Sequence, residues 1–269
     1  MWKVDLKIFF KESWKKYGFV FLLVLVQCIG FHNLIQQYST VNGQEWKLHF
    51  WDYVICFFQG TVPYTQSKGK ETFNIPPYWS LYLIYFVLLI GKLTGQLSKK
   101  YEQQMLLRLK SRKQWWMEMH LKICLECIGY LLVTAATFLI YAFCTKSAIE
   151  GINLKVLQDC LGLEINEKNL RIFSMVIVFF LALLALAYIQ YIISLAINAV
   201  IGILVSIVVL VSSVYQIHPF LIGNYFMGIR QMMFAMDDVG FLIQGAVSVG
   251  IIFFTAVIGY QILKRKDLF

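Results

Sequence analysis

The sequence predicts an all-α membrane protein that crosses the bilayer six times and forms one membrane domain over residues 1–269. Of these 269 residues, 59% are hydrophobic and only 14% are charged, whereas a soluble domain usually carries about 25% charged residues. The apolar residues gather in long runs, and about 20 apolar residues in a helix cross about 30 Å of hydrocarbon. The predicted spans are residues 18–35, 78–97, 123–144, 172–193, 200–215 and 241–262.

A basic, amphipathic segment precedes the first span. Its lysines recur every four residues and would lie on one face of a helix, opposite the apolar side chains of Leu6, Phe9 and Phe10. This pattern is typical of a helix that lies in the membrane interface with its lysines near anionic headgroups. The alternative is a plain basic flank of the first span. The residues that define the predicted interfacial helix are Trp2, Lys3, Lys7, Lys11 and Lys15.

Two further stretches need a separate interpretation. Residues 46–63 are moderately apolar but contain His49 and Asp52, so we expect an interfacial or re-entrant segment rather than a seventh span. Residues 172–215 carry no charge over 44 positions, which is too long for one span. We therefore expect a tight hairpin with its turn at residues 194–198, where polar residues return.

The basic residues predict the orientation. With six spans and the N-terminus inside, the inner segments hold fifteen Lys or Arg in 55 residues, and the outer segments hold eight in 93. This bias follows the positive-inside rule and places both termini in the cytoplasm of a multi-pass protein of the cell membrane. It also accounts for the net charge of +9 without a nucleic-acid partner.

No motif for catalysis or for metal binding occurs. The sequence lacks G-x-x-x-x-G-K-[ST] and H-E-x-x-H, and its four histidines are scattered. Cys124 and Cys127 form one C-x-x-C without a second pair, so we interpret them as small packed residues. The charged residues within the predicted spans are Lys92 and Glu126, which lie at similar depth and are predicted either to pair or to reach the headgroups separately.

Three stretches carry a resemblance to a known family. They are QQMLLRLKSRKQWW at residues 103–116, PFLIGNYFMGIR at residues 219–230 and the C-terminal ILKRKDLF. Together with the basic N-terminal segment and six predicted spans, they resemble the membrane subunit of an exporter-type ABC transporter. The chain is similar to the permeases for bacteriocin or lantibiotic export and self-immunity in Gram-positive bacteria.

The resemblance implies the six-helix exporter fold, a separate ATPase chain that binds ATP and Mg, and a second permease chain, identical or related. It implies a coupling helix between spans two and three, for which the candidate residues are Arg108, Leu109, Arg112 and Trp115. The alternative for this loop is a solvated basic segment. The resemblance also implies a re-entrant element between spans five and six, for which the candidate residues are Pro219, Gly223, Asn224 and Arg230.

The expected function is therefore that of a non-catalytic permease subunit that binds no cofactor itself and exports an amphipathic peptide. The alternative is a membrane protein that sequesters a toxin without ATP. Gly91 and Gly95 form a G-x-x-x-G in span two, which predicts close helix packing either within the chain or between two chains.

Overall fold

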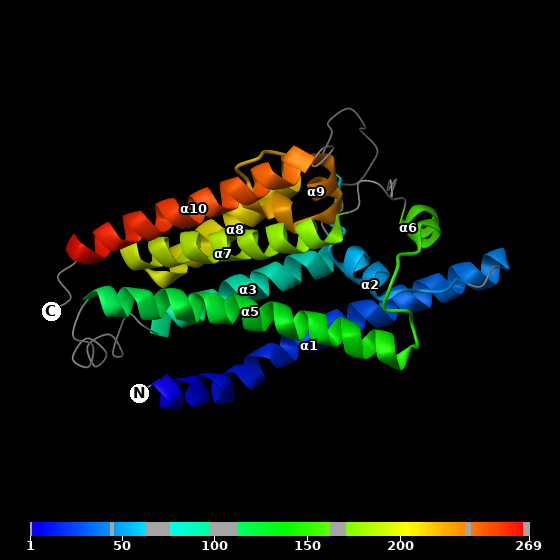
Figure 1. Cartoon of the computed structure of the whole chain (residues 1–269), viewed down its shortest axis with the longest axis horizontal. Coiled ribbons are helices and arrows are strands. Elements are labelled where there is room, and N and C mark those ends of the chain that lie inside the picture. Colours follow the sequence, from blue (N-terminus) through cyan, green and yellow to red (C-terminus); the bar gives the residue numbers. More distant parts are fainter. Residues whose placement is uncertain are drawn as a thin grey trace. The chain divides into compact units, whose positions relative to one another are not determined.

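The computed structural model describes residues 2–43, 46–62, 76–96, 112–161, 171–234 and 238–265. These residues are mainly helical, and apart from one isolated bridge between His49 and Ala148 the described ranges contain no β-structure (Figure 1). The elements are α1 (Trp2–Asn42), α2 (Phe50–Phe57), α3 (Pro77–Gln96), α5 (Arg112–Cys144), α6 (Leu154–Leu161), α7 (Ile172–Ala196), α8 (Ala199–Tyr215), the 3-10 helix η3 (Ile222–Phe226), α9 (Gly228–Phe234) and α10 (Asp238–Arg265).

Five of the described helices are long and apolar enough to cross a membrane: α1, α3, α5, α7 and α10. The protein is therefore an all-helical, multi-pass membrane protein. Helix α8 is apolar but has only 17 residues, which corresponds to about 25 Å at 1.5 Å per residue. It coincides with the predicted span at 200–215.

The predicted helix positions hold best where apolar runs are bounded by turn residues. Helices α3 and α7 match the predicted ranges 78–97 and 172–193 to within three residues. The predicted hairpin turn is confirmed, because α7 ends at Ala196 and the Asn198 Oδ1 accepts the Ile201 N–H at 2.8 Å to cap α8.

Two helices differ from the predicted boundaries. Helix α1 runs without a break over 41 residues, through the basic segment and seven residues beyond the predicted end at 35. Helix α5 begins at Arg112, eleven residues before the predicted start at 123. In both cases polar residues continue the helix, since backbone hydrogen bonding does not require apolar side chains.

The fold divides into two compact units. The first unit contains residues 1–59 and 129–170, and the second contains residues 60–128 and 171–269. Helix α5 contributes its N-terminal half to the second unit and its C-terminal half to the first.

In the first unit, α2 packs against α1 and α6. Aromatic rings fill its interior: Phe31 lies edge-on to Tyr53 at 5.7 Å between centroids, and Phe57 lies edge-on to Phe138 at 5.6 Å. Apolar side chains of α1 complete this core, namely Val20, Val24, Cys28, Phe31 and Ile35.

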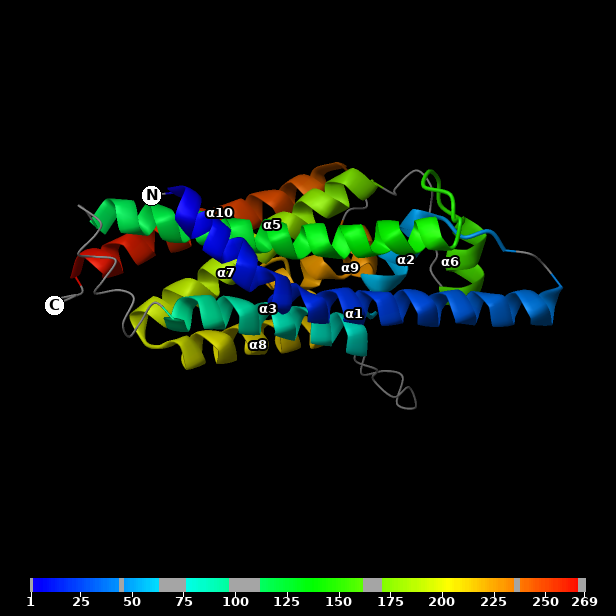
Figure 2. The same ribbon diagram turned by 90° about the horizontal axis from the view of Figure 1, so that it is seen from below.

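In the second unit, α7 packs against α3, α8 and α10, which run beside it in both views (Figures 1 and 2). Glycines permit the close approach of α3 and α8. A side chain at Gly91 would collide with Ile203, and one at Gly95 would touch Ala199 at 3.5 Å. The G-x-x-x-G therefore faces α8 of the same chain, in agreement with the intramolecular alternative.

Candidate functional site

The candidate site lies in the second unit, in the segment between α8 and α10. Arg230 of α9 is completely buried and donates hydrogen bonds to four acceptors. Its Nε bonds the Thr61 carbonyl at 2.9 Å, and its Nη1 bonds Asn224 Oδ1 at 2.6 Å. The guanidinium also bonds the carbonyls of Ser213 and Val214 at the end of α8.

The position of the guanidinium follows from the chemistry of a helix end. The last carbonyls of α8 have no intrahelical partner, and a positive charge near a helix C-terminus is favourable. Burial lowers the pKa of Arg230 to about 10, so the side chain stays protonated at neutral pH. The four acceptors offset the desolvation of this buried charge.

Residues of η3 bond the segment that joins this helix to α8, and η3 itself packs against α8. The Asn224 Nδ2 donates to the His218 carbonyl at 3.2 Å, and the Tyr225 hydroxyl donates to the Pro219 carbonyl. Gly223 approaches α8 so closely that a Cβ would collide with the Ser213 side chain. Pro219 itself is exposed.

The segments before and within α3 join the same cluster. The Trp79 indole N–H donates to the Phe226 carbonyl at 3.0 Å. Gly60 has a φ of +76° and lies where a Cβ would collide with Met227. We call Arg230, Asn224, Gly223 and the groups that they contact the Arg230 junction. Of the four predicted residues of the re-entrant element, Gly223, Asn224 and Arg230 therefore lie together in this buried cluster. The exposed Pro219 joins it only through its carbonyl, which accepts the Tyr225 hydroxyl.

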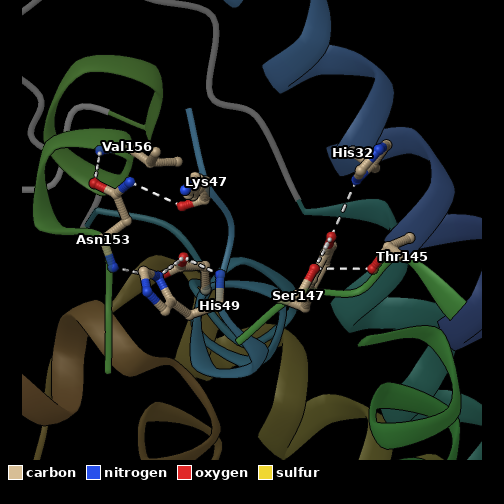
Figure 3. A network of polar contacts seen from close by, with 9 residues as sticks. His32, Lys47, His49, Thr145, Ser147, Asn153 and Val156 are labelled. Carbon is tan, nitrogen blue, oxygen red and sulfur yellow. Dashed lines mark hydrogen bonds and ion pairs between the residues drawn. The ribbon is translucent and has the colours of Figure 1, made fainter. Parts of the chain in front are cut away.

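A second polar cluster lies in the first unit, at the start of α2 (Figure 3). The Asp52 carboxyl is completely buried and accepts the backbone N–H of His49 at 2.8 Å and that of Asn153 at 2.9 Å. The His49 Nδ1 lies 3.4 Å from the same carboxyl. Burial raises the pKa of Asp52, and the N–H groups of His49 and Asn153 oppose this shift.

Asn153 links the starts of two helices in the same unit. Its Oδ1 accepts the Val156 N–H at 3.3 Å and caps α6, while its Nδ2 donates to the Lys47 carbonyl at 2.9 Å (Figure 3). The Phe50 N–H donates to the Ala148 carbonyl at 2.8 Å. Segments 46–52 and 148–156 are therefore joined directly.

A chain of hydrogen bonds connects α1 to the end of α5. The His32 Nδ1 lies 3.1 Å from the Tyr53 hydroxyl, which lies 3.3 Å from Ser147 Oγ. Ser147 Oγ lies 2.8 Å from Thr145 Oγ1, and a dashed line joins these two side chains in Figure 3. Both clusters thus fix backbone segments, and the described residues contain no group of three His, Cys, Asp or Glu that would hold a metal ion.

The predicted coupling residues do not form a described surface. Arg108 and Leu109 lie outside the described residues, and the side chain of Arg112 is not described. Trp115 is 2% exposed, so its indole is part of the interior of the chain. The backbone of residues 2–15 is helical, but the side chains of Trp2, Lys3, Lys7, Lys11 and Lys15 lie outside the description.

Lys92 and Glu126 differ in their surroundings. Lys92 is exposed near the end of α3, whereas Glu126 of α5 is 1% exposed. The structure does not bring these two side chains together as an ion pair within the described residues.

Comparison of the chain with protein-family models, with curated proteins and with solved structures gives no match.

Sequence reasoning did not find Asn153 or the carbonyl of Thr61 as site groups. Asn153 lies 101 residues from its partner Asp52, and Thr61 lies 169 residues from Arg230. One local signal was present for Asn153, because Asn immediately before an apolar helical run is typical of an N-cap. A backbone carbonyl carries no signal of this kind.

Proposed function

We propose that this chain is the transmembrane subunit of an ATP-driven exporter for an amphipathic peptide. It works with a separate ATPase chain, which binds ATP and Mg, and with a second permease chain. The chain itself carries out no chemistry. Helix α8 acts as a sixth span, since an apolar helix of about 25 Å is accommodated by local thinning of the bilayer.

The observation that supports the proposal most strongly is the Arg230 junction. The family that the sequence resembles carries short re-entrant helices between its last two spans, and here η3 and α9 occupy that segment between α8 and α10. Every residue from Ile222 to Gly228 is buried. Short helices at membrane depth are tolerated where they are buried in protein and their polar groups have hydrogen-bond partners. Here the side chains of Arg230 and Tyr225 donate hydrogen bonds to carbonyl groups of this segment and of its neighbours.

Helix α5 suits the transmission of force from an ATPase. It is continuous over 33 residues and begins directly after the basic segment 97–111 of the sequence. A displacement of its inner end therefore reaches the far end of the helix. The spanning helices offer few charged groups, and this composition favours an apolar or amphipathic cargo over a free ion.

Purification of the native complex tests the proposal. The chain is extracted under mild conditions from its own membrane and its partners are identified by mass spectrometry. We expect a P-loop ATPase in stoichiometric amount, and ATP-dependent peptide efflux from vesicles that contain the complex. The matched variant Arg108→Glu with Arg112→Glu should insert normally but retain less ATPase; the pair is needed because each exposed ion pair contributes only about 0–1 kcal/mol.

The sequestering alternative gives the opposite result. Such a protein would protect cells from a peptide toxin without an associated ATPase and at unchanged strength after ATP depletion. That outcome would refute the exporter proposal.

A further inference from the structure

Three lysines of the first unit come together from separate parts of the sequence. The Lys47 carbonyl accepts a hydrogen bond from Asn153, and Lys155 follows Asn153 by two residues. Lys146 precedes Ala148 by two residues, and the Ala148 carbonyl accepts the Phe50 N–H. All three lysines are exposed. Figure 3 shows Lys47 beside Asn153 where the two segments meet. The links described above therefore gather three positive charges on one part of this unit.

The end of α5 defines the level of these lysines relative to the bilayer. The N-terminal part of this helix carries Lys113, Glu118 and Lys122. From Ile123 onward its side chains are uncharged, with the exception of Glu126. From Ile123 to Cys144 the helix has 22 residues, or about 33 Å, which matches the hydrocarbon thickness. Lys146 thus lies where α5 leaves the hydrocarbon, and the links hold Lys47 and Lys155 near it.

The chemistry of the neighbouring side chains fits a headgroup layer. Phe143 and Ile149, on either side of Lys146, are 65% and 46% exposed. Within the described residues none of the three lysines takes part in an ion pair, and the exposed Glu150 is the acidic residue nearest in sequence to Lys146. Apolar side chains that enter the acyl boundary beside lysines that meet phosphates are typical of interfacial binding.

We propose that Lys47, Lys146, Lys155, Phe143 and Ile149 form a docking surface for anionic lipid headgroups of the leaflet in which α5 ends. The lysine amines bind lipid phosphates, and this contact holds the segments at the starts of α2 and α6 on the membrane surface. The five residues of this surface lie in the first unit, and the proposal does not depend on export.

Hydrogen exchange of the full chain in lipid nanodiscs tests the surface. Backbone amides of residues 46–50 and 147–155 are compared in discs of phosphatidylcholine alone and in discs that also contain phosphatidylglycerol. We expect slower exchange in the anionic discs, by about fivefold for each lysine engaged, and loss of the difference at high salt. The amides of the turn at 196–200 serve as an internal reference and should not change.

The triple variant should lose the dependence of hydrogen exchange on anionic lipid, and its exchange in phosphatidylcholine discs should match that of the wild type. Its three changes are Lys47→Gln, Lys146→Gln and Lys155→Gln. Glu150→Gln should keep or increase the dependence. Equal exchange of the wild type in both lipids, or a dependence that survives the triple change, would overturn the proposal. Protection in phosphatidylcholine discs by an added acidic peptide, without any effect of anionic lipid, would assign the surface to a soluble partner and would overturn it as well.

Discussion

At Arg230, one side chain satisfies acceptors from three parts of the second unit: the segment before α3, the end of α8 and η3. Replacing it by methionine keeps much of the volume but leaves these buried acceptors without a donor. Each buried polar group that loses its partner costs about 1–3 kcal/mol. We therefore expect Arg230→Met to lower the free energy of unfolding by about 2–4 kcal/mol, measured as thermal unfolding in detergent.

Arg230→Lys should fall between the wild type and Arg230→Met, because an ammonium group cannot reproduce the planar arrangement of guanidinium donors. Lys155→Met, which removes an exposed cation, is the matched control and should unfold close to the wild type. An Arg230→Met protein as stable as this control would show that the junction contributes little.

Asp52 gives a prediction about pH. Burial raises the pKa of its carboxyl, so the folded chain binds this proton more tightly than the unfolded chain. The resulting stability is fully present below the unfolded pKa of about 3.9 and is lost as the pH rises through the folded pKa. We expect the stability of the wild type relative to Asp52→Asn to increase as the pH falls from neutral towards about 4, measured as the difference in unfolding midpoint.

Asp52→Asn should also cost about 1–3 kcal/mol at every pH, because its amide nitrogen faces a backbone N–H in place of an acceptor. The exposed carboxylate of Glu150 provides the control, and Glu150→Gln should leave the pH profile unchanged. A difference between wild type and Asp52→Asn that does not vary with pH would contradict the raised pKa.

At the residue level, the sequence indicates polar groups but not their partners. Asp52 was visible as a polar interruption of an apolar stretch, whereas Arg230 was a candidate only through the resemblance to a permease family. Their partners include backbone N–H and C=O groups more than a hundred residues away, and no local pattern encodes such pairs. Trp115 was a candidate coupling residue through the resemblance, and no local pattern indicated that packing in the second unit buries its side chain.

At the scale of elements, the contact between η3 and α8 depends on a glycine. A methyl group at Gly223 would collide with the side chain of Ser213 and would lie 3.5 Å from Leu210 Cα. We expect Gly223→Ala to destabilise the chain by about 1–3 kcal/mol through overpacking. The measurement is thermal unfolding in detergent.

Gly250 of α10 is the matched control, since a Cβ there has no neighbour within 4 Å. Gly250→Ala should be neutral or stabilising by up to about 1 kcal/mol, in line with helix propensity. Combining Gly223→Ala with Ser213→Gly should recover part of the loss. Additive losses in the double variant would show that the two side chains do not meet.

Helix positions were predictable to different degrees. Hydropathy located α3, α7 and α8 closely because each apolar run ends at polar or turn residues. It placed the start of α5 too late and the end of α1 too early, since a helix continues through polar residues at the membrane surface. The short helices α2, α6 and α9 depend on tertiary contacts, because isolated helices of seven or eight residues are marginal in water.

At the scale of the whole molecule, the orientation in the membrane remains a prediction from charge. The predicted inner segments carry basic residues at a density of fifteen in 55, against eight in 93 for the outer ones. Inversion would place the dense basic segments outside, against the positive-inside rule.

We expect Glu150→Cys to react with a membrane-impermeant thiol reagent in intact cells and Lys113→Cys to react only after lysis. Both positions are exposed in the structure, so a failure to react reflects the membrane and not burial. The six native cysteines are first replaced by serine, because Cys144 is exposed and would add background. Labelling of Lys113→Cys in intact cells, with Glu150→Cys protected until lysis, would invert the topology and place the basic segment 97–111 out of reach of a cytoplasmic ATPase.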